Sequence, residues 1–168
     1  MTLPELNEAP VSELKAALTA CCGSSAWVKD MVKLFPVDSR ETLFEQAEMI
    51  WFACSEADWK EAFAHHPKIG DIGSLRSKFA STRNWASGEQ SGVAEASEEI
   101  LRRLAEGNRL YEEKFGYIFI VCATGKSASE MLNILESRLP HSPEKEIQIA
   151  MQEQNKITKI RLEKLLGT

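Results

Sequence analysis

The chain has 168 residues, of which 43% are hydrophobic and 27% are charged, and its formal net charge is −5. These values are ordinary for a soluble globular protein, so we expect one domain over residues 1–168 with a substantial core. The acidic balance and the lack of a face-sized cluster of lysine and arginine argue against nucleic acid as a partner.

Targeting signals, membrane-spanning segments and cysteine spacing indicate where the protein is located. The N-terminal MTLPELNEAP lacks the basic and apolar segments of a secretory signal, and LLGT at the C-terminus is not an SKL-type peroxisomal address. The longest apolar run, residues 117–123, is too short to span a bilayer. The cysteines, Cys21, Cys22, Cys54 and Cys122, lack CxxC spacing and are typical of buried reduced thiols. We therefore predict a cytoplasmic protein that does not contact membranes.

Helical periodicity dominates the first 66 residues. The first predicted helix has Ser12 as its N-cap and stops at Gly23. The pattern predicts three more helices, which cover residues 25–35, 39–53 and 55–66. The last of these opens on a capping box of Ser55 and Asp58 and stops at Pro67.

A less regular stretch, residues 67–94, precedes three further predicted helices. They cover residues 95–116, 127–139 and 143–166, and the second opens on a capping box of Ser127 and Glu130. The third has Ser142 as N-cap, Pro143 at the first helical position and Gly167 just past its end. Only residues 117–124 could form a strand, and that strand has no partner. The predicted fold is therefore an all-α, single-domain multi-helix bundle.

Two histidines stand side by side before a proline in AFAHHPKIGD, residues 62–71. On a helix, Trp59 and Phe63 define an apolar stripe, and His66 falls on that stripe whereas His65 falls on the far side. His66 is therefore the inward histidine, at a helix end that favours a cation. Its imidazole could transfer a proton at neutral pH, or it could be a packed core histidine bonded to one backbone group.

The last predicted helix carries an arginine on its apolar stripe. The stripe consists of Ile147, Ala150, Met151, Ile157, Leu162 and Leu165. Arg161 lands within it, together with Gln154 and Thr158. A guanidinium there needs an anionic or carbonyl partner. It is either a forked clamp for a carboxylate or ureido group, or a structural ion pair or snorkelling side chain.

Two other stretches carry polar groups that could bind a ligand. Glu89 and Gln90 lie between two glycines in WASGEQSGV and offer a carboxylate and an amide to a nitrogen-rich ligand. The apolar segment before Thr124-Gly125-Lys126-Ser127 ends without the phosphate-loop pattern, which excludes a nucleotide loop. A break between helices there could still direct backbone groups into a pocket.

Four blocks in order resemble one family over nearly the whole chain. They are HPKIGD at 66–71, GEQSGV at 88–93, NRLYEEKFGYIFIVCATGKSASEML at 108–132 and EQNKITKIRLEKL at 153–165. The sequence resembles the 2-oxo-4-hydroxy-4-carboxy-5-ureidoimidazoline (OHCU) decarboxylase family of urate degradation. The resemblance implies an all-α, cofactor-free and metal-free enzyme, commonly a homodimer, that converts OHCU to (S)-allantoin and carbon dioxide.

The resemblance also implies roles for individual residues. His66 and Glu89 correspond to catalytic positions, with His66 as the general acid/base. Substrate contacts correspond to Pro67, Gln90, Arg161 and the segment Phe119, Ile120, Val121, Cys122 and Ala123. Lys68 follows Pro67 where many members have arginine. Many members also have a serine where this chain has Ala86, and the neighbouring Ser87 is the candidate replacement.

Three alternatives remain open on the sequence alone. The chain could be a non-catalytic helical interaction module of the same fold, which would have no pocket around His66. It could be a decarboxylase of the same fold that acts on another ureido or imidazoline acid, because pocket shape sets specificity. A metal site of His65, His66 and Cys54 is disfavoured, because adjacent histidines point apart on a helix.

Overall fold

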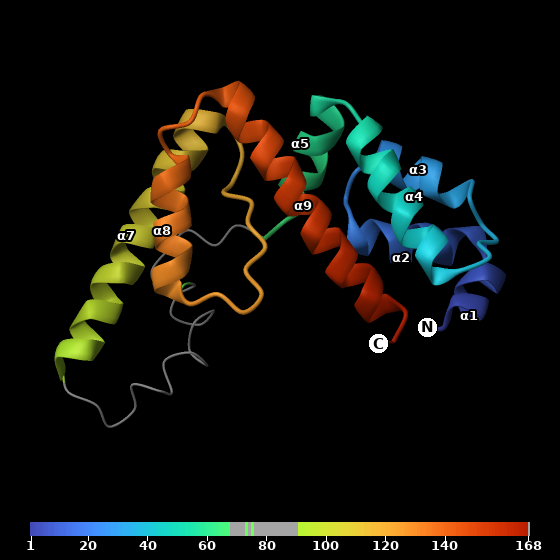
Figure 1. Cartoon of the computed structure of the whole chain (residues 1–168), viewed down its shortest axis with the longest axis horizontal. Coiled ribbons are helices and arrows are strands. Elements are labelled where there is room, and N and C mark those ends of the chain that lie inside the picture. Colours follow the sequence, from blue (N-terminus) through green and yellow to red (C-terminus); the bar gives the residue numbers. More distant parts are fainter. Residues whose placement is uncertain (68–72, 74, 76–90, 168) are drawn as a thin grey trace. The chain divides into compact units, whose positions relative to one another are not determined.

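The structure, a computed structural model, describes residues 1–67, 73, 75 and 91–167, with the side chains of 91–97 not among the described ones. Among these residues all regular secondary structure is helical, which confirms the all-α fold class. The helices are α1 (Leu3–Glu8), α2 (Val11–Cys21), α3 (Ser25–Val32), α4 (Arg40–Ala53), α5 (Glu56–Ala64), α7 (Ser91–Phe115), α8 (Ala128–Arg138) and α9 (Pro143–Leu165). Figure 1 shows them in chain order.

The chain divides into two compact units. Unit 1 consists of residues 1–66, 120–122 and 147–168, and unit 2 of residues 67–119 and 123–146. α9 contributes its first turn to unit 2 and the rest to unit 1. The assignment of residues 1–168 to a single family domain stays a prediction.

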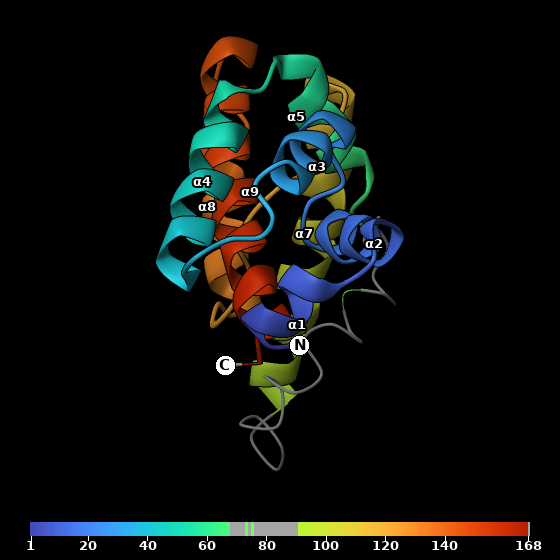
Figure 2. The ribbon, with the colours of Figure 1, turned by 90° about the vertical axis from the view of Figure 1, so that its right-hand side faces the viewer.

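The core of unit 1 is built around large aromatic side chains. Trp27, Trp51 and Phe63 are at most 1% exposed. Their burial is compatible with their polar atoms, because the indole N–H groups of Trp27 and Trp51 donate to the carbonyls of Ala47, at 3.0 Å, and Met151, at 2.8 Å. The second bond ties α4 to α9, which run side by side in Figures 1 and 2. α9 therefore forms one wall of this core.

Helix starts in unit 1 follow local capping chemistry, with one error and one omission in the sequence prediction. Ser39 and Ser55 cap α4 and α5 as predicted, and the second forms the full capping box with Asp58. Ser12 is not an N-cap: α2 begins at Val11 after Pro10, whose fixed φ already suits a helix start. α1 was not predicted, although Thr2 and Glu5 form a capping box for it.

Unit 2 is centred on the pairing of α7 with α8, which lie side by side in Figure 1. Gly107 of α7 permits the close approach, since a Cβ there would lie 2.5 Å from a methyl carbon of Leu135 on α8. Ser127 caps α8 as predicted. Among the described residues, 117–124 form no strand but an irregular connection between the two helices, consistent with the absence of a partner strand.

A buried polar cluster lies in unit 2. The Glu146 carboxylate, which is fully buried, accepts from Arg138 Nε at 2.8 Å, from the hydroxyl of Tyr111, and faces His141 Nδ1 at 3.1 Å. Burial, together with the bond to Glu146, raises the pKa of Tyr111. The cluster compensates the buried Arg138 charge within the protein.

No helix in the described part of the chain is long and apolar enough to cross a bilayer.

Candidate functional site

The end of α5 separates the two histidines as periodicity predicts. His65 is the C-cap of α5 and is exposed, whereas His66 is half-buried and faces α9. The helix ends here because Pro67 disfavours a helical conformation at His66 and cannot donate a backbone hydrogen bond. The inward orientation of His66, predicted from Trp59 and Phe63, is confirmed by its half-buried state and its contact with Gln154.

His66 is the first member of a chain of polar side chains. Its Nε2 lies 2.5 Å from Oε1 of Gln154, and Gln154 Nε2 donates to Thr158 Oγ1 at 3.1 Å. Thr158 also acts to lower the pKa of Cys22, the C-cap residue of α2, against the larger effect of burial. Gln154 is 1% exposed and Thr158 is 4% exposed. The His66 imidazole, which can carry a proton, is therefore held by hydrogen-bonded side chains of α9 within unit 1.

The surroundings of His66 favour its neutral form. Burial is the largest effect and lowers its pKa below 6.5, the hydrogen bond with Gln154 opposes the shift, and the Arg161 charge adds to it. Burial also raises the pKa values of Cys21 and Cys22 to about 11, so both are neutral thiols at pH 7. The imidazole is therefore the group of this cluster that can take a proton at neutral pH.

Arg161 is half-buried on the same face of α9 as Gln154 and Thr158. Its positive charge acts on His66, Cys21 and Cys22. Within the described part of the chain, its guanidinium makes no hydrogen bond or ion pair. Its position beside a neutral imidazole suits a group that receives an anionic or carbonyl ligand.

The segment 120–122 belongs to unit 1 with His66 and Arg161. Ile120 is 2% and Cys122 is 8% exposed, and Val121 is half-buried. The backbone N–H of Cys122 donates to the Glu153 carboxylate on α9 at 3.1 Å. Any ligand contact of Cys122 would therefore use its other atoms or require Glu153 to move.

The remaining predicted site residues fall in unit 2 or outside the described residues. Pro67 is exposed, whereas Phe119 and Ala123 are half-buried. The Phe119 ring stacks under the Arg138 guanidinium, 4.7 Å from its centre. Ser87, Glu89 and Gln90 were predicted as site residues and lie outside the described residues.

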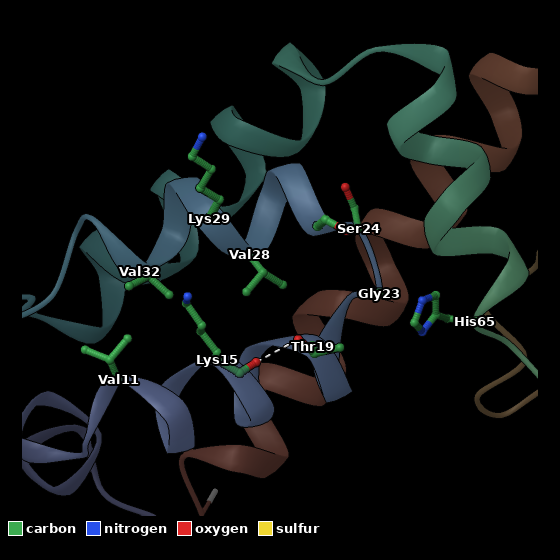
Figure 3. A pocket seen from close by; sticks show the side chains of 10 residues that line it. Val11, Lys15, Thr19, Gly23, Ser24, Val28, Lys29, Val32 and His65 are labelled. Carbon is green, nitrogen blue, oxygen red and sulfur yellow. Dashed lines mark hydrogen bonds between the residues drawn. The ribbon is translucent and has the colours of Figure 1, made fainter.

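A separate pocket of about 530 Å³ opens between α2 and α3 in unit 1. Figure 3 shows the His65 ring beside Gly23 at one end and the Lys15 side chain reaching between valines at the other. Gly23 is required here, since an added Cβ would lie 2.3 Å from His65 Cγ. His65 therefore packs against the α2–α3 connection and lines this pocket.

Gln154 and Thr158 are the residues whose role the sequence did not assign. Their spacing with Arg161, at i, i+4 and i+7 on an otherwise apolar stripe, was the available signal.

No group of three or more His, Cys, Asp and Glu side chains suited to a metal occurs among the residues that the structure describes.

Comparisons with known proteins show which proteins this chain is similar to. A family model described as OHCU decarboxylase matches residues 7–163. The uric acid degradation bifunctional protein TTL of Arabidopsis thaliana is 43% identical over 150 residues. A crystal structure described as OHCU decarboxylase in the presence of (S)-allantoin is 39% identical, with a TM-score of 0.71, and the match covers 89% of this chain and 96% of that one.

The match covers much of this chain but less of some relatives. It includes 88% of this chain and 45% of the Arabidopsis protein. The uric acid degradation bifunctional protein of Bacillus sp. (strain TB-90) is 25% identical over 98% of this chain and 32% of its own length. The chain thus spans less than half the length of these two relatives.

Proposed function

Because the chain belongs to the OHCU decarboxylase family, we propose that it converts OHCU to (S)-allantoin and carbon dioxide in urate degradation. The observation that carries the proposal is the neutral, half-buried His66 held by Gln154 on the unit that also carries Arg161. The 39% identical structure, described as determined in the presence of (S)-allantoin, supports the choice of product.

The substrate supplies its own electron sink in the proposed reaction. Its carboxylate is attached to a ring carbon next to a C=N bond. When the carbon–carboxylate bond breaks, the electron pair forms a new ring C=C bond and the C=N pair moves to nitrogen. The chemistry is therefore complete without a metal or an organic cofactor.

His66 is the proposed general acid/base. It takes the proton of the ring hydroxyl as carbon dioxide leaves, and it returns that proton to the ureido-bearing carbon while the hydroxyl oxygen becomes a carbonyl. The ring nitrogen that received the electron pair takes one proton from solvent, so decarboxylation of the carboxylate consumes one proton overall. Delivery of the carbon-bound proton from one face produces the S configuration.

The other predicted residues hold the substrate in this proposal. Arg161 grips the ureido or carbonyl end by a forked contact, and Gln90 holds a carbonyl. Glu89 orients the imidazole or a ring N–H. The segment 119–123, Pro67 and Ser87 contribute further contacts, and a low solvent content protects the intermediate from protonation on the wrong face.

Assembly and location are part of the same proposal. We propose a homodimer located in the cytoplasm, with the small-molecule substrate as its ligand. Light scattering on the purified protein, compared with the mass of one chain, checks the first point.

The experiment that tests the function generates OHCU in place from urate with the two preceding enzyme activities and follows circular dichroism. Uncatalysed decay gives racemic allantoin, which has no lasting signal. The expected result is a growing signal of the S enantiomer that His66→Ala abolishes. A folded protein without that signal would favour a non-catalytic module or another ureido acid as substrate.

A further inference from the structure

Gln154 is a buried amide with a partner at each end. It is 1% exposed on the inner face of α9, where an unpaired amide would be costly. Its oxygen faces His66 Nε2 at 2.5 Å and its nitrogen faces Thr158 Oγ1 at 3.1 Å. Both ends of the amide are thus used within unit 1.

The two contacts of the amide define which way it faces. Its nitrogen donates to the hydroxyl oxygen of Thr158 at 3.1 Å. Its oxygen is therefore the atom that faces His66.

The orientation of the amide selects the tautomer of the imidazole. An amide oxygen carries no hydrogen, so the ring nitrogen facing it must donate. In a neutral imidazole only one nitrogen carries a proton, so the lone pair is then on Nδ1. This assignment follows from the hydrogen-bond chain Thr158–Gln154–His66.

We propose that Gln154 is a positioning residue that holds His66 as its Nε2–H tautomer and makes Nδ1 the nitrogen that accepts the substrate proton. The proposal rests on the proposed function for its catalytic consequence. Thr158 acts one step further out, because its hydroxyl oxygen accepts from the Gln154 amide nitrogen.

The electrostatic surroundings keep His66 neutral, so its tautomer determines which ring nitrogen can accept a proton. Burial and the Arg161 charge lower the pKa of His66, so the ring is neutral near pH 7 and one nitrogen has a free lone pair. The described groups that influence His66 are Gln154 and Arg161 on α9 and His65 on its own element. Without Gln154, the proton can move to Nδ1, and that form cannot accept a proton there.

The first test is ¹⁵N NMR of the full chain with labelled histidine, and it needs no substrate. The His66 signals are those absent from His66→Asn. Nε2 couples to both ring carbon-bound protons, whereas Nδ1 couples strongly to one, so the protonated nitrogen is identified directly. The expected result at pH 7.5 is a protonated Nε2 and an unprotonated Nδ1. A protonated Nδ1 would overturn the proposal.

The second test compares variants of Gln154 in the OHCU assay. Gln154→Leu removes the acceptor, and we expect kcat to fall by about tenfold to hundredfold, as for other partners that orient a functional histidine. KM should change little, because Gln154 does not touch the substrate. Gln152→Leu, an exposed glutamine on the same helix, is the matched control and should retain the wild-type kcat.

Gln154→Glu separates positioning from packing. Its carboxylate still accepts from Nε2 but stabilises the imidazolium, so the acidic limb of the kcat/KM profile should move up by about one to three pH units. At pH values above that limb, activity should recover towards the wild type, whereas Gln154→Leu stays low at every pH. Equal pH profiles for the two variants would reject the positioning role.

The outcomes distinguish this inference from the proposed function. If wild-type protein has no activity on OHCU but Nε2 carries the proton, the tautomer assignment holds and the proposed function fails. If it is active and Nδ1 carries the proton, the function holds and the Gln154 role fails. Should Gln154→Leu not fold, the NMR experiment and Gln154→Glu still decide.

Discussion

His65 and His66 are neighbours at the end of α5, but their side chains have opposite environments. His65 lies exposed against Gly23, whereas His66 contacts the buried Gln154. The 100° step per residue makes this difference, because one histidine continues the stripe of Trp59 and Phe63 and the other does not. The proposed chemistry therefore belongs to one histidine of the pair.

Substitution of each histidine in turn tests this division. We expect His66→Asn to lower kcat by about 10²- to 10⁴-fold, the usual contribution of a general acid/base, with the fold retained. His65→Asn should leave kcat within about threefold of the wild type, because its ring lines the pocket between α2 and α3 and does not contact Gln154. Initial rates by circular dichroism and melting curves check both. Equal losses from the two variants would contradict the inward/outward assignment.

Arg161→Lys tests whether the guanidinium of Arg161 binds the substrate through a forked, two-bond contact. Arg161→Lys keeps the charge but replaces a planar fork by a point donor. We expect KM for OHCU to rise by roughly tenfold to hundredfold, in line with the loss of a hydrogen bond to a charged group. Steady-state kinetics with matched circular dichroism spectra measure the change. An unaltered KM would remove Arg161 from the substrate site.

At the scale of the elements, the connection between α2 and α3 helps to position the end of α5. The α2–α3 connection passes so close to the end of α5 that Gly23 has no room for a side chain. The atoms it would meet are Cγ, Cβ and Cδ2 of His65, and the clash with Cβ, which is bonded directly to the backbone, cannot be relieved by a change of rotamer. The location of the His66 backbone thus depends on a glycine distant in sequence.

Gly23→Ala should therefore disturb both stability and activity. We expect a loss of about 1–3 kcal/mol in the free energy of unfolding, typical of overpacking, and a lower kcat because the end of α5 must move. Urea denaturation and initial rates are the measurements. Gly107→Ala is the comparison: its Cβ would meet Cδ2 and Cγ of Leu135, at 2.5 and 3.2 Å, and a gain of up to about 1 kcal/mol in helix propensity offsets part of that cost, so we expect a smaller loss of stability. Similar losses from both would contradict this distinction.

The first turn of α9 and the end of α8 share the buried cluster of unit 2. Glu146 compensates the 3% exposed Arg138, and Tyr111 adds a hydroxyl donor. Glu146→Ala would leave Arg138 buried without its carboxylate partner. We expect a loss of about 3–5 kcal/mol in the free energy of unfolding, measured by urea denaturation.

Arg103→Ala is the control for that change. It breaks a pair with Glu136 in the same unit whose side chains are 49% and 45% exposed, so water screens the charges. The expected loss is about 0–1 kcal/mol. Comparable effects for the buried and exposed pairs would show that burial does not decide the contribution of these pairs.

At the scale of the whole molecule, the neutral state of His66 links the site to global stability. Its pKa is lowered on folding, so below its ordinary value of 6.5 the unfolded chain binds a proton that the folded chain does not. Its contribution to stability is therefore complete above pH 6.5 and is lost as pH falls through the folded pKa. The proposed catalytic rate should fall over the same range, because the base becomes protonated.

Urea midpoints of the wild type and His66→Asn at pH 7.5 and 5.5 test this linkage. We expect the wild type to lose more stability between the two pH values than the variant does, since asparagine does not titrate in this range. An identical loss in both proteins would assign the pH dependence to other groups.

The sequence by itself determined the all-α class and the starts of α4, α5, α8 and α9, because caps and periodicity are local properties that act within one or two turns. The same periodicity found the inward faces of His66 and Arg161. It did not find α1, whose capping box was present but whose six residues carry little apolar pattern.

Only the tertiary structure decided what those inward side chains meet. His66 and Gln154 are 88 residues apart in the sequence, and their contact joins the end of α5 to α9. This contact leaves no local signal in the sequence, because it forms only when distant helices pack. The family resemblance named the proton carrier, whereas the hydrogen-bond chain behind it, and thus the nitrogen proposed to act, required the packed helices of unit 1.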